Sequence, residues 1–141
     1  MEQVIESEPS APVVLHVSPG PHVHSRSLST RRMMLDVLIA LAPVLVAAIA
    51  VFRLYALMQV GICVASCLAF EWLFAAMRGR RAALDDGSAA VTGVILGLSL
   101  PWSAPWYVAL IGGMTAIGLG KACFGGLGQN IFNPAMVGRA F

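Results

Sequence analysis

The chain has 141 residues, of which 58% are hydrophobic and 11% are charged, whereas soluble domains carry roughly 25% charged residues. Its formal net charge of +2 is too small to indicate a nucleic-acid partner. The composition therefore excludes a soluble catalytic domain and predicts an all-α integral membrane protein embedded in the lipid bilayer.

Residues 1–32 are polar and contain several prolines, with no helical or alternating pattern, so we predict an extended polar tail. Early glutamates and the absence of an early apolar stretch argue against a cleaved signal peptide. Membrane insertion is then expected to use apolar segments within residues 33–141, the predicted transmembrane region.

The first two apolar segments, residues 33–52 and 54–77, are each long enough to cross a bilayer as a helix of about 30 Å or more. Only Arg53 separates them, so a tight antiparallel hairpin is expected. Pro43 lies inside the first segment and predicts a kink there. Asp36 lies near its start, where the helix dipole favours a carboxylate.

Basic residues cluster on the two outer flanks of this hairpin, while Arg53 stands alone in its turn. The clusters are Arg26, Arg31 and Arg32 before the first segment, and Arg78, Arg80 and Arg81 after the second. By the positive-inside rule both clusters lie in the cytoplasm. The N-terminal tail is therefore predicted to be cytoplasmic.

Two shorter apolar runs follow, residues 89–100 and 106–120, separated by a turn that contains prolines and tryptophans. Each run alone gives only about 18 to 22 Å of helix, less than the thickness of the hydrocarbon layer. We expect flanking residues to extend them into two spans, at about 87–104 and 105–123, which would return Lys121 to the cytoplasmic side. A re-entrant helical pair is the alternative.

A glycine-rich polar loop at residues 124–133 carries Gln129, Asn130 and Asn133. Asn133 followed by Pro134 is typical of a helix start, so a fifth helix is expected from residue 134. Residues 134–141 are too few to cross a membrane. We therefore expect a bundle of about four transmembrane helices plus the start of a fifth, and the chain to be the first part of a longer subunit.

Glu71 is the most informative single residue, because a carboxylate within an apolar helix is costly and usually faces a partner, a cavity or an ion path. It is the candidate for an ion pathway. The alternative is a structural carboxylate that reaches the membrane interface or stays protonated among neighbouring helices.

Glycines and other small residues recur at four-residue spacing, which lets helix backbones approach closely. The pairs are Gly61 with Ala65, Gly93 with Gly97, and Gly112 with Ala116. Helix packing is the expected role, with a ligand groove as the alternative. Cys63 and Cys67 share a helix face without a histidine nearby, so no metal site is assigned. No catalytic residues are evident in this chain.

The stretch from Asp86 to Phe141 resembles the D subunit of the Rnf (Rsx) ion-translocating oxidoreductase complex. Its most specific motif is GGLGQNIFNPAM at residues 125–136. Upstream, Glu71 and the tail pattern Ser-Pro-x-x-His, from Ser18 to His22, fit the same family. The B subunit of the sodium-pumping NADH:quinone reductase is a close relative, and the short tail favours the Rnf type.

The resemblance implies a multi-pass subunit of the bacterial inner membrane, in a translocase that couples ferredoxin and NAD redox chemistry to cation movement, with the other Rnf membrane subunits as partners. The family carries FMN, linked through its phosphate to a threonine in a Ser-Gly-Ala-Thr type motif that does not occur here. Thr92 and Thr115 lie in a different context. We therefore expect no covalent FMN on this chain, and a noncovalent flavin would need further helices.

Two other functions remain open at this point. The family fold is similar to that of urea channels, so a small transporter or channel is one alternative, and Glu71 would suit its permeation path. A passive assembly subunit is the other, because the packing glycines need no cofactor. A measurement of bound flavin would distinguish the transporter and the assembly subunit from an electron-transport subunit.

Overall fold

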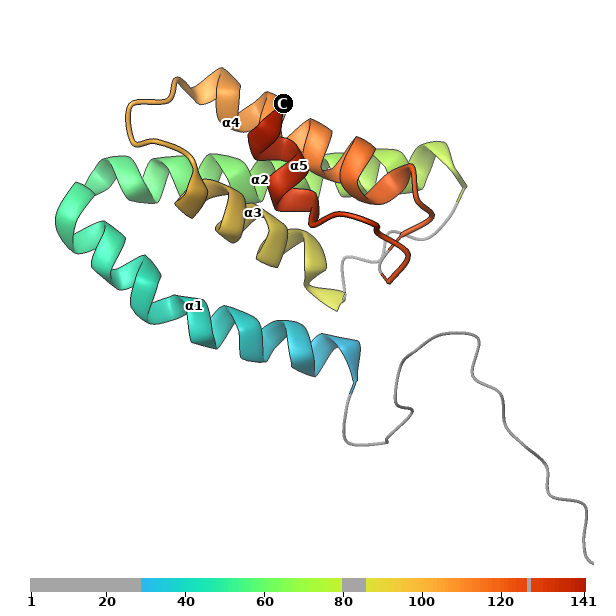
Figure 1. Ribbon diagram of the computed structural model, residues 1–141, viewed down its shortest axis with the longest axis horizontal. Coiled ribbons are helices and arrows are strands. Elements are labelled where there is room, and N and C mark those ends of the chain that lie inside the picture. Colours follow the sequence, from blue (N-terminus) through green and yellow to red (C-terminus); the bar gives the residue numbers. More distant parts are fainter. Residues whose placement is uncertain (1–28, 80–85, 127) are drawn as a thin grey trace, which may run out of the picture.

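The computed structural model describes residues 29–79, 86–126 and 128–141, and every regular element within these ranges is helical. Most of the predicted tail, together with Arg80, Arg81 and Asp85, lies outside the described residues. The elements in chain order are α1 (Thr30–Phe52), α2 (Leu54–Met77), α3 (Ser88–Ser99), α4 (Trp106–Ile117), a π-helix (Gly118–Ala122) and α5 (Pro134–Ala140) (Figure 1).

The first two helices follow each other as predicted, with one residue between them, but they diverge from that turn and do not pack as the tight antiparallel hairpin that was expected. α1 has 23 residues and α2 has 24, and both are long and apolar enough to cross a membrane. Arg53 is the single residue between them, with a φ of 54° that reverses the chain direction at once. At the other end of α1, Ser29 caps the helix by accepting a hydrogen bond from the Arg32 amide at 3.3 Å.

Helix α1 packs only loosely against the rest of the bundle. Its first turns approach the start of α3, where a Cβ atom added to Gly87 would lie 3.7 Å from the Met34 Cβ. None of its residues is fully buried by the other described residues, and Figure 1 shows it diverging from α2. It bends partway along, as expected from Pro43, which removes one backbone donor and crowds the preceding turn.

Helix α2 is the central element, against which α3 and α4 both pack (Figure 1). The core between these helices is built from small and medium side chains rather than large ones. Its buried members are Cys63, Cys67, Ala89, Leu96, Ala109, Ala116, Ile117 and Ala135. Both cysteines therefore act as small apolar residues of the core.

Glycines set the short distance between α2 and α3. A Cβ atom added to Gly93 would lie 2.5 Å from the Val64 Cα, and one added to Gly97 would lie 2.7 Å from the Val60 Cα. The packing role predicted for this pair is confirmed. It does not hold for Gly61, which has no described atom within 4 Å of such a Cβ and lies on the exposed face of α2.

Helices α3 and α4 have 12 residues each, shorter than the spans predicted at about 87–104 and 105–123. Pro101 and Pro105 bound the intervening turn, which leaves Trp102 and Trp106 exposed. Helix α4 does not stop at Ile117, because the chain continues as the π-helix to Ala122.

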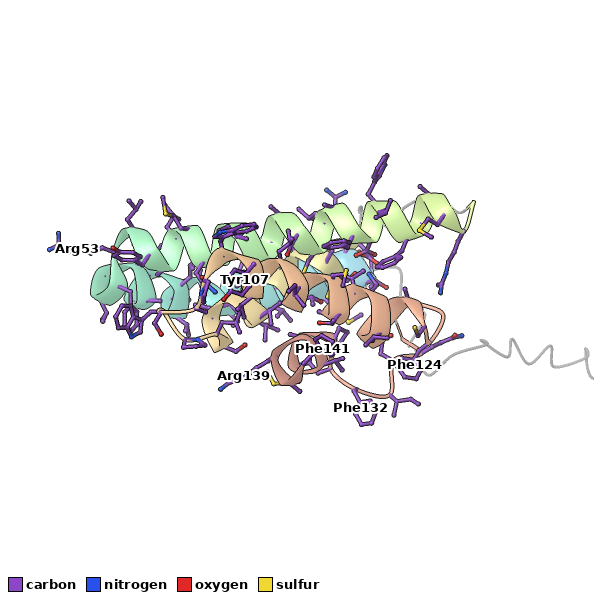
Figure 2. All side chains as sticks on the ribbon, turned by 90° about the horizontal axis from the view of Figure 1, so that it is seen from above. Arg53, Tyr107, Phe124, Phe132, Arg139 and Phe141 are labelled. Atoms are coloured by element: carbon purple, nitrogen blue, oxygen red, sulfur yellow. The ribbon has the colours of Figure 1, made fainter. Side chains whose placement is uncertain are left out.

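The fifth helix begins at Pro134, as predicted. The Asn133 side chain accepts a hydrogen bond from the Ala135 amide at 3.0 Å, and proline occupies the first turn. Gly138 lies against α4, where an added Cβ would be 2.3 Å from the Gly112 carbonyl oxygen. Figure 2 shows this helix, with Arg139 and Phe141, on the outer side of α4.

Candidate ion site

The Glu71 carboxylate is buried in the bundle although it lies on a helix made almost entirely of apolar residues. Glu71 is 7% exposed and lies in the last third of α2. A charged group at such a position needs a partner, because moving it out of water carries a large desolvation cost.

Lys121 supplies that partner. Its ammonium group donates hydrogen bonds to the Glu71 Oε1 atom and to the Ser88 Oγ atom, the latter at 2.6 Å. Lys121 is itself buried and belongs to the π-helix that follows α4. A π-turn shifts the helix face by about one residue relative to a regular α-helix, which brings this lysine toward α2, and such turns are frequent at functional sites.

The start of α3 completes the network. Ser88, the first residue of that helix, donates its hydroxyl proton to the Asp86 Oδ1 atom at 2.8 Å, and the same oxygen accepts from the Ser88 amide at 2.9 Å. The Asp86 carboxylate thus accepts from the first amide of α3, while Gly87 occupies the N-cap position. Ser88 thereby links the buried lysine to this half-buried carboxylate nearer the surface.

One carboxylate oxygen of the site has no partner among the described residues. Glu71 Oε2 is buried, and no donor among the described residues lies within hydrogen-bond distance of it. A carboxylate with one oxygen held by a lysine and the other without a partner can accept a proton. The described residues contain no cluster of three or more histidine, cysteine, aspartate or glutamate side chains that could hold a metal ion. The second carboxylate, Asp86, is connected to Lys121 through the Ser88 hydroxyl group.

Lys121 and Ser88 were not predicted as site residues, and Lys121 was expected on the cytoplasmic side. The structure buries both side chains. One signal was available, because Glu71 and Lys121 are each the sole charge in a long apolar stretch. Two such charges of opposite sign are expected to pair inside a helical bundle.

The polar loop before α5 is largely exposed among the described residues. Gln129 and Asn133 are exposed and Asn130 is half-buried, so the described residues do not enclose a buried polar site there. In the amide orientation that satisfies both groups, Asn130 donates to the Gly120 carbonyl at 3.3 Å and to the Gly126 carbonyl at 3.0 Å. The loop is thereby tied to the π-helix that carries Lys121.

Replacing Asn133 with alanine is expected to lower stability by about 1 kcal/mol, because the Ala135 amide loses its capping acceptor. Thermal unfolding of the detergent-solubilised protein measures the effect. Asn133→Asp keeps an acceptor at the same place and should behave like the unchanged protein. Equal losses in both variants would mean that the cap is not what the asparagine contributes.

The two threonines considered for flavin attachment do not fit that role. Thr92 donates its hydroxyl to the Ser88 carbonyl at 2.9 Å, and Thr115 donates to the Ile111 carbonyl at 3.0 Å. Both side chains are buried within helices that pack against α2. Neither threonine is therefore assigned to a phosphate-linked FMN.

Comparison with known proteins extends over nearly the whole chain. The model of the NQR2, RnfD, RnfE family matches residues 16–141. The chain is 46% identical over 127 residues to the D subunit of the Na(+)-translocating ferredoxin:NAD(+) oxidoreductase complex of Acetobacterium woodii, covering 90% of this chain and 40% of that protein.

The D subunits of two ion-translocating oxidoreductase complexes are similar to a comparable degree. That of Marinobacter nauticus is 46% identical over 123 residues and that of Haemophilus ducreyi is 40% identical over 124 residues, with 86% of this chain and 35% of each relative covered. The chain thus spans well under half the length of these relatives. Because the family model covers far more than half of the chain, this protein belongs to the NQR2, RnfD, RnfE family of membrane proteins.

Proposed function

We propose that the chain is part of the D subunit of an electron-transport complex that couples ferredoxin and NAD redox chemistry to cation translocation. The Acetobacterium woodii relative is named for ferredoxin, NAD(+) and Na(+) translocation, the Haemophilus ducreyi relative is named for ion translocation, and family membership supports the same role here. The partners are the other membrane subunits of such a complex, and the location is the bacterial inner membrane. A flavin bound to the complete subunit would supply the electron transfer.

The topology that we propose has four transmembrane helices, with the N-terminus and the Arg78 end of α2 in the cytoplasm. The length and composition of α1 and α2 support two of the crossings. For the shorter pair, α3 lies against the long α2 and α4 continues through the π-helix, which lengthens its path through the bilayer. The basic residues on either side of the two long helices support the orientation.

The buried network of Glu71, Lys121 and Ser88 is the observation that carries the proposed coupling role. Helix packing alone does not need an ion pair in an apolar bundle, and a pair of apolar residues of the same size is usually at least as stable. An open carboxylate oxygen beside a tethered ammonium group is suited to exchange a cation or a proton, with Lys121 compensating the charge of Glu71 between exchanges.

Replacing Glu71 with glutamine tests this role. The amide oxygen still accepts from Lys121, but the negative charge is lost and the buried ammonium group is left without its counter-charge. The yield and unfolding temperature of the complex are therefore measured beside uptake. We expect cation uptake driven by electron transfer to fall about 10- to 100-fold, the effect of losing one hydrogen bond or contact to a charged group. The measurement is cation uptake in proteoliposomes that contain the complete complex.

Two controls accompany this variant. Asp36→Asn removes an exposed carboxylate from α1 and should leave uptake unchanged, while Glu71→Asp keeps the charge and should retain part of it. Electron transfer from ferredoxin to NAD is measured in the same preparations. If uptake by the Glu71→Gln complex equals that of the unchanged complex, the carboxylate has only a structural role.

A further inference from the structure

A continuous chain of three hydrogen bonds connects the buried ion pair to a carboxylate nearer the surface. The Lys121 ammonium group donates to the Glu71 Oε1 atom on one side and to the Ser88 Oγ atom, at 2.6 Å, on the other. The Ser88 hydroxyl donates in turn to the Asp86 Oδ1 atom at 2.8 Å. Ser88 and Lys121 are buried and Asp86 is half-buried, so this hydrogen-bonded chain runs from the interior toward water.

The surroundings of Glu71 disfavour a metal ion and suit a proton. Its Oε2 atom, which has no partner among the described residues, is buried, so an ion with its ligands cannot approach it. A metal cation would also lie close to the Lys121 ammonium group, whose charge repels it. A proton needs no cavity, because it passes along hydrogen bonds that already exist.

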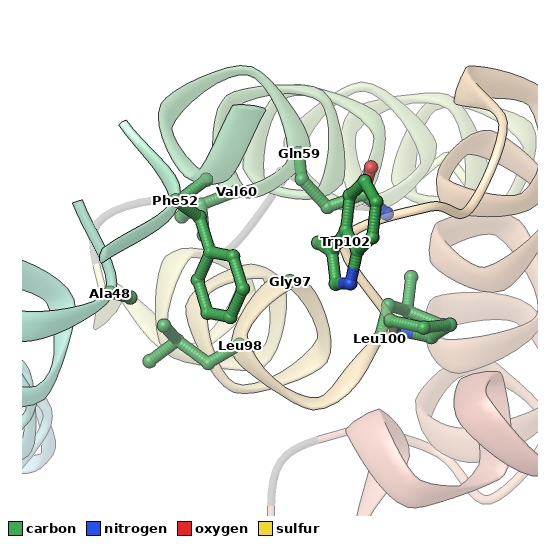
Figure 3. A pocket seen from close by; sticks show the side chains of 10 residues that line it. Ala48, Phe52, Gln59, Val60, Gly97, Leu98, Leu100 and Trp102 are labelled. Carbon is green, nitrogen blue, oxygen red and sulfur yellow. The ribbon is translucent and has the colours of Figure 1, made fainter. Parts of the chain in front are cut away.

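The pocket at the far end of α2 does not lead to the ion pair. It measures about 240 Å³ and opens between α1, α2 and the end of α3, with Gln59 and Trp102 among its lining residues (Figure 3). Gln59 precedes Glu71 by about 18 Å along the helix axis. None of the described residues that line this pocket belongs to the hydrogen-bonded chain. Within the described part of the protein, the Asp86 end of the chain is therefore the way to water.

The other ionisable groups around Glu71 do not compete for this proton. Cys67 lies one turn earlier on α2 and is buried, but a thiol is a much weaker acid than a carboxyl group and keeps its own proton. Asp36 on α1 and Arg78 after α2 are exposed. Among the described residues, the proton on Glu71 therefore depends on Lys121 and on the groups that follow it.

We propose that Asp86 receives, through this chain, the proton that Glu71 releases, and that the ion exchanged at the site is therefore a proton. Lys121 passes a proton from Nζ to Ser88 Oγ while Ser88 passes its own hydroxyl proton to Asp86 Oδ1. This leaves a neutral amine, an intact hydroxyl group and a carboxylic acid. A half-turn of the protonated Glu71 carboxyl group then delivers its proton to the amine, which restores the ammonium group and leaves a carboxylate. Asp86 finally gives its proton to water, and the same steps in reverse load Glu71.

Asp86→Asn tests the proposal, because it separates taking up a proton from accepting hydrogen bonds. The amide oxygen still accepts from the Ser88 amide and hydroxyl, and asparagine serves as well as aspartate at the start of a helix. The measurement is the infrared carbonyl band of protonated Glu71 in the complete solubilised complex, followed over time after a flash-activated reductant delivers electrons. The band is assigned by its absence from the Glu71→Gln complex.

We expect this band to decay about 100-fold more slowly in the Asp86→Asn complex, the smaller end of the contribution that a positioned proton-transfer group makes. Asp36→Asn, the same substitution at an exposed position of α1, should leave the decay unchanged. Asp86→Ala should also be slow, and sodium formate, a small carboxylate that fits the space left, should restore much of the rate.

A role of Asp86 only in holding the start of α3 predicts the opposite pattern. The Asp86→Asn complex would then behave like the unchanged complex, and formate would not help Asp86→Ala; either result overturns the relay. The relay rests on the coupling role proposed for Glu71, which cation uptake by the Glu71→Gln complex tests separately. A normal decay in Asp86→Asn beside lost uptake in Glu71→Gln would overturn the relay and leave that role standing. If no Glu71 band responds to reduction, proton exchange at the site is overturned as well.

Discussion

Replacing Lys121 with methionine is expected to destabilise the protein by about 3 to 5 kcal/mol, because the Glu71 carboxylate is then buried without its partner. Ser88 loses a donor at the same time, since the lysine ammonium contacts both groups. The measurement is the yield of monodisperse protein after solubilisation, together with its unfolding temperature. Methionine keeps most of the apolar stem, so packing is little changed.

A double variant separates loss of pairing from loss of lysine. Combining Lys121→Met with Glu71→Leu removes both charges, and stability should return to near or above that of the unchanged protein. Arg139→Met is the matched control, because it removes an exposed basic residue from α5. If the double variant is as unstable as the single one, the ion pair is not the source of the effect.

Replacing Gly93 with alanine should also have a large effect, because its new methyl group would meet the α2 backbone. The added Cβ would lie 2.5 Å from the Val64 Cα, closer than real Cβ contacts, and backbone atoms cannot rotate away. We expect a loss of about 1 to 3 kcal/mol or more as α2 and α3 move apart. Thermal unfolding in detergent reports the change.

Gly61→Ala provides the opposite case within the neighbouring helix. No described atom lies within 4 Å of the added Cβ, and α2 gains a better helix former. Stability should therefore rise slightly or stay the same. If Gly61→Ala is as harmful as Gly93→Ala, flexibility of glycine rather than close helix contact explains both positions.

Local features of the fold could be predicted because they depend on neighbouring residues. The succession of α1 and α2 follows from two long apolar segments with one arginine between them, and the start of α5 follows from Asn133 and Pro134. Each rests on helix length or on capping, which residues close in sequence determine.

The site could be predicted only in part, because its partners are distant in sequence. Glu71 is recognisable alone as a carboxylate in an apolar helix, but Lys121 follows it by 50 residues along the chain. Their meeting depends on where α4 packs on α2 and on the π-turn that rotates the lysine. Neither the packing register nor that turn leaves a local pattern in the sequence.

The loose packing of α1 has a consequence for how the protein is made. Because no residue of α1 is buried by the described bundle, this helix can leave the insertion machinery for lipid before the rest of the chain has been synthesised. α3 cannot do so, since a 12-residue helix of about 18 Å is too short to be stable alone in the hydrocarbon layer. It is therefore expected to enter the lipid packed on α2, so biogenesis proceeds from an independent anchor to a jointly inserted core.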